Sequence, residues 1–219
     1  MKADRININS TEEIIAEKLL KIGAVFLRPD DPFTWASGIK SPIYCDNRLI
    51  LSAPKVRNVV EEAMAMAIDE SFPECEVIMG TSTAGIAHAA LAANLLGLPM
   101  GYVRGKAKDH GRANQIEGKL EKGQKVVVVE DLISTGGSVL ETVEALREAG
   151  GDVLGIVSIF TYGLETSVEA FRSEKIKAIS LCNLDVLVDV AVRNKYIEFG
   201  QKNKILSFRS NPEHWYVGL

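Results

Sequence analysis

Runs of apolar residues alternate with amphipathic segments through the middle of the chain. Four consecutive valines, Val126–Val129, run directly into two acids, a pattern typical of a strand buried on both faces of a parallel sheet. The segment after them places Val139, Val143 and Leu146 on one face of a helix. The same patterns predict helices over 55–70, 167–172 and, as the last one, 185–192, and strands over 77–80, 98–104, 152–160 and 178–181. This alternation predicts an α/β fold with a parallel sheet flanked by helices.

The first 54 residues follow a less regular pattern. The tetrapeptide Ser10–Glu13 matches a capping box, and a helix is expected to follow it as far as Gly23. A short strand is expected over 25–27. The segment Phe33–Ser41 contains Gly and Ser and is flanked by prolines, which favours a loop or a hairpin rather than core. With 219 residues and 47% apolar content, the chain is expected to form one domain, or one domain with a small appendage.

The turn after the valine strand, Ser134–Ser138, consists of small and hydroxylated residues. Backbone N–H groups at the start of a helix favour an anion, and glycines let the backbone approach it closely. Two carboxylates, Glu130 and Asp131, stand at the end of the strand before this turn. A sugar with two free hydroxyls and a phosphate would satisfy both features, so we interpret the stretch as a ribose-5-phosphate site. The alternative is an ordinary turn with N-capping hydroxyls; the stretch matches neither the Walker loop nor the dinucleotide-binding glycine pattern.

Two more segments carry candidate chemistry. Thr81–Gly85 is a second strand-to-helix turn of small, hydroxylated residues, and parallel strands would bring it to the same edge of the sheet as the first turn. A capped helix start is the alternative for this turn, and His88 in the following helix is expected to be packed or on the surface. Residues 105–119 are basic, contain three glycines and show no apolar periodicity. We interpret them as a lid over an anionic substrate, with a solvated charged face as the alternative.

Composition narrows the classes of function. The net charge of −4 argues against a nucleic-acid binder and against binding to an anionic membrane surface. The three cysteines are widely spaced and show neither a metal-binding pattern nor a disulfide framework. The N-terminus has no apolar signal region, and the most apolar window, 84–100, contains His88 and Asn94, so it is not a membrane span. We therefore expect a cytoplasmic protein without nucleic-acid or membrane partners.

Three segments resemble motifs of one enzyme family. Val126–Ser138 resembles the phosphoribosyl-diphosphate signature of the type I phosphoribosyltransferases. Arg104–Gly111 and Phe33–Arg48 resemble, respectively, the flexible loop and the N-terminal base-binding segment of those members that act on orotate. The resemblance covers the chain from about residue 12 to residue 165. It implies a type I phosphoribosyltransferase core with a small N-terminal hood, within a single domain 1–219: hood about 1–54, core about 55–182 and C-terminal segment 183–219.

The resemblance also implies an activity: transfer of the ribosyl 5-phosphate group of phosphoribosyl diphosphate to orotate, giving orotidine 5-phosphate and diphosphate in pyrimidine nucleotide (UMP) biosynthesis. Catalytic roles are implied for Lys108, His110 and Asp131. Phosphoribosyl-diphosphate binding is implied for Arg104, Lys108, His110, Glu130, Asp131, Leu132, Ile133, Ser134, Thr135, Gly136, Gly137 and Ser138. Mg²⁺ would be carried by the substrate rather than by direct protein ligands. In related enzymes the lid serves the neighbouring subunit's site, which implies a homodimer.

Orotate contacts are implied for Ser134, Tyr44 and Lys40, with Arg48 as a further candidate, because an acidic pyrimidine needs donors for its carboxylate and ring carbonyls. A solvated basic hairpin with a packed tyrosine is the alternative for the hood residues.

The chain departs from the family pattern at several positions. Many relatives carry a lysine where this chain has Ala36 or Ala84, and some have an arginine in place of Tyr162. The lysine often found next to the lid arginine is here Gly105, and Glu130 replaces the first aspartate of the acid pair. Two other functions stay open: a transferase for another base, such as a purine, and a non-catalytic regulator that senses phosphoribosyl diphosphate and binds nucleic acid. The basic hood argues against the first, and the acidic net charge against the second.

Overall fold

The computed structural model describes residues 8–35, 38–105 and 115–216, with side chains from residue 11 onward. Its centre is a six-stranded sheet in the order β10-β9-β8-β5-β6-β7. Neighbouring strands run parallel except for the short strand β7, which pairs antiparallel with β6. The strands are β5 (Val77–Thr81), β6 (Met100–Val103), β7 (Ile116–Glu117), β8 (Lys125–Ile133), β9 (Asp152–Thr161) and β10 (Lys177–Asn183). This sheet confirms the predicted α/β fold.

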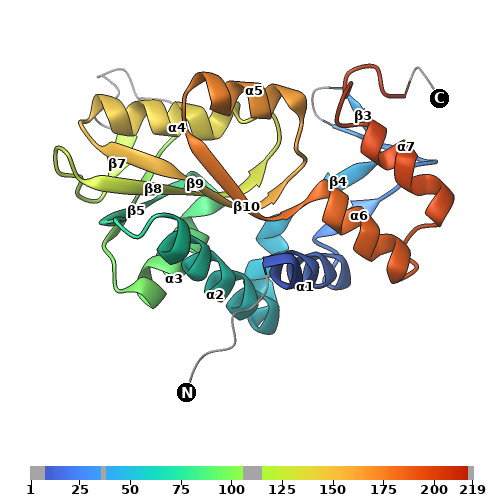
Figure 1. The fold of residues 1–219 in the computed structure, drawn as a ribbon, viewed down its shortest axis with the longest axis horizontal. Helices are drawn as coiled ribbons and strands as arrows, with labels where there is room; N and C mark the ends of the chain where they lie inside the picture. Colours follow the sequence, from blue (N-terminus) through green and yellow to red (C-terminus); the bar gives the residue numbers. More distant parts are fainter. Residues whose placement is uncertain (1–7, 36–37, 106–114, 217–219) are drawn as a thin grey trace.

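Helices cover both faces of the sheet (Figure 1). On one face α4 packs against β8 and β9, and α5 packs beside α4; on the other face α2 and α3 pack against β9 and β8. These helices are α2 (Pro54–Ser71), α3 (Gly85–Leu96), α4 (Gly137–Glu148) and α5 (Glu165–Ser173). Helix α6 (Leu184–Arg193) follows β10 and packs against the N-terminal helix α1 (Ile8–Lys21). No helix in the described ranges is long and apolar enough to cross a membrane.

The valine run of β8 forms the centre of the molecule. All four residues of Val126–Val129 are fully buried, and β8 lies between β5 and β9. Val127 and Val129 belong to one hydrophobic core, whereas Val126 and Val128 belong to a second core. Because successive side chains of a strand point to opposite faces, the four valines fill the cores on both sides of the sheet.

The buried histidine of α3 is structural. His88 is fully buried, and its Nδ1 lies 2.6 Å from Oε1 of Glu61 on α2. The pair joins the two helices that cover one face of the sheet. The prediction of a packed rather than a catalytic histidine is therefore confirmed.

The N-terminal residues form a small subdomain beside the sheet. Strands β1 (Val25–Leu27) and β4 (Ile43–Cys45) pair antiparallel, β2 (Phe33–Thr34) and β3 (Lys40–Ser41) form a hairpin, and the 3-10 helix η1 (Asn47–Ser52) leads into α2. From here on, the name hood, predicted for about residues 1–54, is used for residues 25–52 only. The predicted capping box is wrong, because helical backbone begins at Ile8, so Ser10 lies inside the helix instead of capping it.

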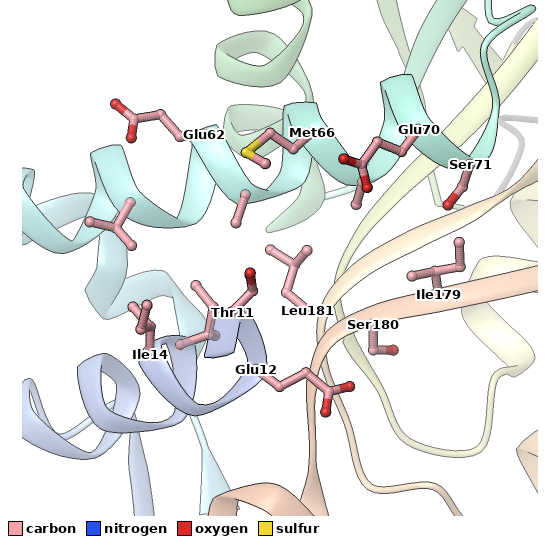
Figure 2. Close-up of a pocket in the computed structure, with 14 residues that line it drawn as sticks. Thr11, Glu12, Ile14, Glu62, Met66, Glu70, Ser71, Ile179, Ser180 and Leu181 are labelled. Atoms are coloured by element: carbon pink, nitrogen blue, oxygen red, sulfur yellow. The ribbon is translucent and has the colours of Figure 1, made fainter. Parts of the chain in front are cut away.

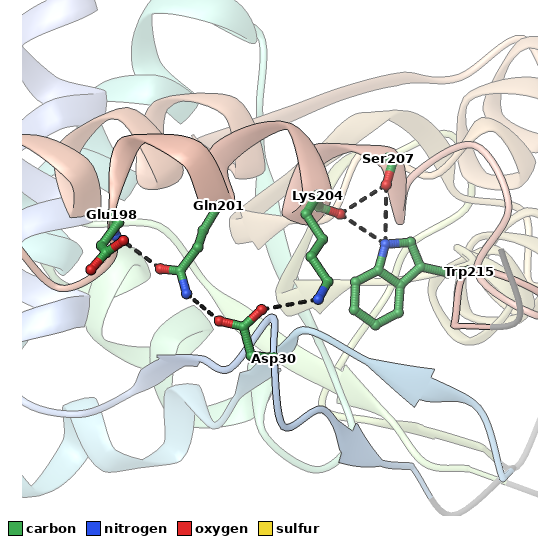
Figure 3. A network of polar contacts seen from close by, with 6 residues as sticks. All are labelled: Asp30, Glu198, Gln201, Lys204, Ser207 and Trp215. Carbon is green, nitrogen blue, oxygen red and sulfur yellow. Dashed lines mark hydrogen bonds and ion pairs between the residues drawn. The ribbon is translucent and has the colours of Figure 1, made fainter. Parts of the chain in front are cut away.

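The C-terminal segment packs against the hood, and α6 is not the last helix. The 3-10 helix η3 (Phe199–Gln201) and helix α7 (Lys202–Ser207) follow it. Asp30 of the hood accepts hydrogen bonds from Gln201 and Lys204, at 2.5 and 3.0 Å, and Trp215 donates to the backbone of α7 (Figure 3). The Phe208 ring contacts both Trp35 of the hood and Trp215. The tail therefore supports the hood from outside the core, which its sequence had not indicated.

Candidate functional site

One cleft lies where the carboxyl ends of the central strands meet the hood. It encloses about 660 Å³ and is lined by residues from β4, η1, the end of β8 and the turn before α3. These residues are Cys45, Asp46, Arg48, Leu51, Thr83, Ala84, Ala87 and Asp131. The carboxyl edge of a parallel sheet is where open α/β folds bind ligands. The structure therefore joins three predicted elements in one place: the acid pair, the second strand-to-helix turn and the hood.

The two acids of β8 have different surroundings. The Glu130 side chain is buried; its Oε1 accepts hydrogen bonds from Thr81 Oγ1 at 2.7 Å and from the Asp131 backbone N–H at 2.9 Å. Burial and the adjacent Asp131 carboxyl together raise the pKa of Glu130 to about 8, against the lowering effect of the hydrogen bond from Thr81. Asp131 is half-buried and lines the cleft. Asp131 is thus the acid of this pair that a ligand in the cleft meets first.

Glu130 makes folding stability depend on pH. Its pKa in the folded protein, about 8, lies above the ordinary value of 4.5, so the folded state binds more protons than the unfolded state between these pH values. The contribution of Glu130 is therefore fully present below pH 4.5 and is lost as the pH rises through 8. Glu130→Gln stays neutral and keeps an acceptor oxygen. Relative to wild type, the free energy of unfolding of this variant should therefore rise by about 4 kcal/mol between pH 5 and pH 9.

Urea unfolding of wild type and Glu130→Gln at several pH values measures this difference. A constant difference between the two proteins across this pH range would show that Glu130 is already ionised in the folded protein.

The turn Ser134–Ser138 leads into α4 with its backbone N–H groups uncapped. Gly136 precedes the helix with a φ of +84°, and no side chain within the described part of the chain caps the first turn. A side chain at Gly136 would be strained at this φ, and its Cβ would lie 3.1 Å from the Phe171 ring. Ser134 is half-buried, whereas Thr135 and Ser138 are exposed. The turn therefore presents free N–H groups and hydroxyls, as the anion-site interpretation requires.

The second turn, Thr81–Gly85, lies against both β8 and the base of the predicted lid. A Cβ on Gly85 would lie 2.6 Å from the carbonyl oxygen of Val129, so only glycine lets α3 begin this close to β8. Ser82 Oγ accepts a hydrogen bond from the Gly105 N–H at 2.7 Å. The neighbouring Arg104 forms an ion pair with Glu117 of β7, with Nε and Oε1 3.1 Å apart. The described end of the lid is thus attached to this turn, whereas Lys108 and His110 lie outside the described residues.

Arg48 brings a positive charge from the hood to the cleft. Its guanidinium forms two hydrogen bonds with the Asp46 carboxylate, at 2.6 and 2.8 Å, and this contact raises the pKa of Arg48 and lowers that of Asp46. Arg48 also interacts electrostatically with Tyr44 and Asp131. Its side chain is largely exposed, so it is accessible to an anionic ligand.

The predicted orotate contacts Lys40 and Tyr44 are exposed on the hood and do not line the cleft beside Asp131. Tyr44 alternates with the buried Ile43 and Cys45 along β4 and packs against Phe33, with the ring centroids 5.6 Å apart. Tyr44 lines a second hollow of about 300 Å³, which is also lined by Thr34. Lys40 Nζ donates to Thr34 Oγ1 at 2.7 Å. The role of Lys40 and Tyr44 in orotate binding stays a prediction.

A third hollow has unsuitable chemistry for an anionic substrate. It lies between α1, α2 and the edge strand β10, and its polar side chains include the carboxylates of Glu12, Glu62 and Glu70 around an apolar floor (Figure 2). Among the residues that the structure describes, no basic side chain lines it. A phosphorylated or carboxylated ligand would meet like charges there, so the cleft beside Asp131 is the candidate active site.

Sequence reasoning missed several residues of this cleft. Asp46 lines the cleft and binds Arg48, Asn47 links the hood to the core, and Thr81 binds Glu130. The cluster of polar residues at 46–48, directly before the apolar run of η1, was the available signal. Tyr162, at a position where some relatives have arginine, is buried against Trp35 and Phe160. It serves packing here, and any orotate contact must come from another residue.

Comparison with known proteins defines the class. The family described as phosphoribosyl transferase domain matches residues 48–200, which is more than half of the chain. This range contains the sheet, both strand-to-helix turns and the acid pair. The chain therefore belongs to the phosphoribosyltransferases, and its fold is of that class.

Individual relatives narrow the class further. The chain is 56% identical to the orotate phosphoribosyltransferase of Listeria innocua, over 94% of this chain and 99% of that protein, and 58% identical to that of Bacillus subtilis, over 92% and 94%. The crystal structure of the orotate phosphoribosyltransferase from Aeropyrum pernix aligns with a TM-score of 0.71 at 30% identity, covering 80% of this chain and 96% of that one. The chain belongs to the orotate phosphoribosyltransferase family.

Proposed function

We propose that the protein transfers the ribosyl 5-phosphate group of phosphoribosyl diphosphate to orotate, releasing diphosphate and forming orotidine 5-phosphate. The observation that carries this proposal is the meeting of Asp131, the anion-binding turn and the basic hood residue Arg48 at one sheet edge, in a chain of this family. The reaction would serve pyrimidine nucleotide biosynthesis.

In the proposed reaction, the bond from the ribose carbon to the diphosphate breaks as the bond to an orotate ring nitrogen forms, and the proton of that nitrogen passes to the departing diphosphate or to solvent. Positive charge develops on the sugar and negative charge on the leaving diphosphate, so the protein needs placed charges rather than a covalent nucleophile. Asp131 binds the ribose hydroxyls and favours the developing positive charge. The turn Ser134–Ser138 holds the 5-phosphate with its N–H groups, and Ser134 also reaches orotate.

The lid residues act on the leaving group in this proposal. Arg104, Lys108 and His110 neutralise the diphosphate, and closure of the predicted lid keeps water from the reactive sugar. The lid must be shorter than the predicted 105–119, because Ile116–Glu117 form strand β7 and pair with β6 in the sheet. Arg104 starts this segment next to the turn Thr81–Gly85, so the lid and the second anion-binding turn approach the diphosphate together. The lid of one subunit would serve the site of its neighbour in a homodimer.

Magnesium fits this donor set in a limited way. Mg²⁺ prefers oxygen ligands and keeps several waters. Two carboxylates line the cleft, Asp131 and Asp46, and Asp46 is paired with Arg48. Glu130 is engaged by Thr81 and the backbone. The ion, carried by the diphosphate and the ribose hydroxyls, would supply charge neutralisation of the leaving group. Asp131 would support it through those hydroxyls.

The test is a turnover assay on wild type and Lys108→Ala with orotate, phosphoribosyl diphosphate and magnesium. We expect the wild type to consume orotate and Lys108→Ala to lose about 100-fold in kcat, by analogy with the loss of one charge-stabilising donor. Lys122→Ala, which changes an exposed lysine before β8 at the opposite sheet edge, should match wild type.

Each other outcome of this assay revises a different assignment. Equal turnover by Lys108→Ala would remove that residue from the chemistry. Faster turnover with adenine or hypoxanthine than with orotate would replace the base assignment. Absence of turnover together with retention on RNA or DNA at physiological salt would favour the alternative function, a non-catalytic regulator that senses phosphoribosyl diphosphate.

A further inference from the structure

Asn47 joins the hood to the acid pair across 84 positions of sequence. Its side-chain Nδ2 donates a hydrogen bond of 2.7 Å to the backbone carbonyl oxygen of Asp131. Its Oδ1 accepts from the thiol of Cys45, with Sγ and Oδ1 3.3 Å apart. Asn47 is 1% exposed. Both ends of the amide are therefore engaged in a buried position, which fixes the orientation of the side chain.

The backbone of Asp131 is held on both sides of its Cα atom. The N–H group donates to Glu130 Oε1 at 2.9 Å, and the carbonyl oxygen accepts from Asn47. The direction of the Asp131 side chain depends on these two backbone contacts, because the side chain itself projects from the strand end into the cleft. Removing the Asn47 donor would leave a carbonyl group without its partner and free to turn.

We propose that Asn47 is a positioning residue that aims the Asp131 carboxylate at the ribose hydroxyls of phosphoribosyl diphosphate. The inference rests on the proposed function, because it takes that ligand as the occupant of the cleft. In this proposal the hood does more than cover the base, because Asn47, the first residue of η1, also sets the geometry of the ribose site.

The test compares Asn47→Ala and Asn47→Asp with a control in the same subdomain. Ser41→Ala removes another buried polar side chain of the hood, whose hydroxyl contacts only Ile43 among the described residues. We expect kcat/KM for phosphoribosyl diphosphate to fall about 30-fold in Asn47→Ala, mostly through KM, and less than threefold in Ser41→Ala. Thermal unfolding of all variants shows that the assays are made on folded protein.

Asn47→Asp adds a readout that a purely structural role would not change. The introduced carboxylate cannot donate to the Asp131 carbonyl, whereas the protonated carboxyl can. Its activity relative to wild type should therefore improve at least fivefold between pH 8 and pH 5.5. The positioning role would be overturned if the activity of Asn47→Asp relative to wild type did not change with pH. It would also be overturned if Asn47→Ala and Ser41→Ala lost the same factor in kcat/KM.

Calorimetric binding of phosphoribosyl diphosphate with magnesium separates this inference from the proposed function. Should the wild type bind that ligand but fail to consume orotate, the reaction is wrong, and weaker binding by Asn47→Ala than by Ser41→Ala still supports the positioning role. Should the wild type turn over orotate and Asn47→Ala bind as well as wild type, only the inference about Asn47 fails.

Discussion

Asp131→Asn is expected to lower kcat/KM for phosphoribosyl diphosphate by about 1,000-fold. The substitution keeps the size of the side chain and both backbone hydrogen bonds, but it removes the negative charge that faces the cleft. That charge binds the ribose hydroxyls in the proposed ground state and favours the positive charge of the transition state. The substitution should therefore lower kcat and raise KM. Steady-state kinetics with saturating orotate measures the effect.

The matched control for this prediction is Asp152→Asn. Asp152 is an exposed aspartate at the first position of β9, at the opposite edge of the sheet. It should retain the kinetics of wild type. If Asp131→Asn lost less than tenfold in kcat/KM, the acid that faces the cleft would not be the ribose ligand, and Glu130 would have to take that role.

Gly85→Ala is expected to lower the free energy of unfolding by about 3 kcal/mol, together with the affinity for phosphoribosyl diphosphate. The new Cβ would lie 2.5 Å from Thr81 Oγ1 and 2.6 Å from the carbonyl oxygen of Val129, and the latter is backbone that cannot turn away. Helix α3 must therefore shift from β8. The shift moves the cleft-lining residues Thr83 and Ala84 and disturbs the contact between Thr81 and Glu130.

Urea unfolding and calorimetric binding measure the two effects of Gly85→Ala. Gly200→Ala is the control, because a Cβ at that glycine would meet nothing within 4 Å. If the two variants were equally stable, the start of α3 would not be packed against β8 as described. If Gly85→Ala were as stable as wild type but bound phosphoribosyl diphosphate more weakly, Gly85 would matter for ligand binding and not for stability.

The core could be predicted because the local sequence pattern of its residues indicates that they are buried. Four β-branched residues in a row, Val126–Val129, are compatible with a strand only when both faces are buried, and the structure fills both faces. Short apolar runs separated by amphipathic segments then required parallel strands with helical crossovers. The strand-to-helix turn at Ser134–Ser138 could be predicted for the same reason, and its role as an anion site stays a prediction.

Features that depend on contacts between distant segments could not be predicted. The raised pKa of Glu130 results from its burial in the folded chain, where its carboxyl contacts Thr81, 49 positions away in the sequence. The hydrogen bond from Asn47 to Asp131 joins a 3-10 helix of the hood to the end of β8, and nothing in either segment alone indicates it. The C-terminal support of the hood by Trp215 and Lys204 rests on short elements without periodicity.

The most direct test of the account is a crystal structure of the protein with phosphoribosyl diphosphate and magnesium. We predict the 5-phosphate at the N–H groups of Ser134–Ser138, the ribose hydroxyls within hydrogen-bond distance of the Asp131 carboxylate, and the diphosphate toward Thr81–Gly85. A 5-phosphate bound at Thr81–Gly85 instead, or a ligand in the second hollow, lined by Arg28 and Tyr44, would contradict the assignment of the ribose-5-phosphate site.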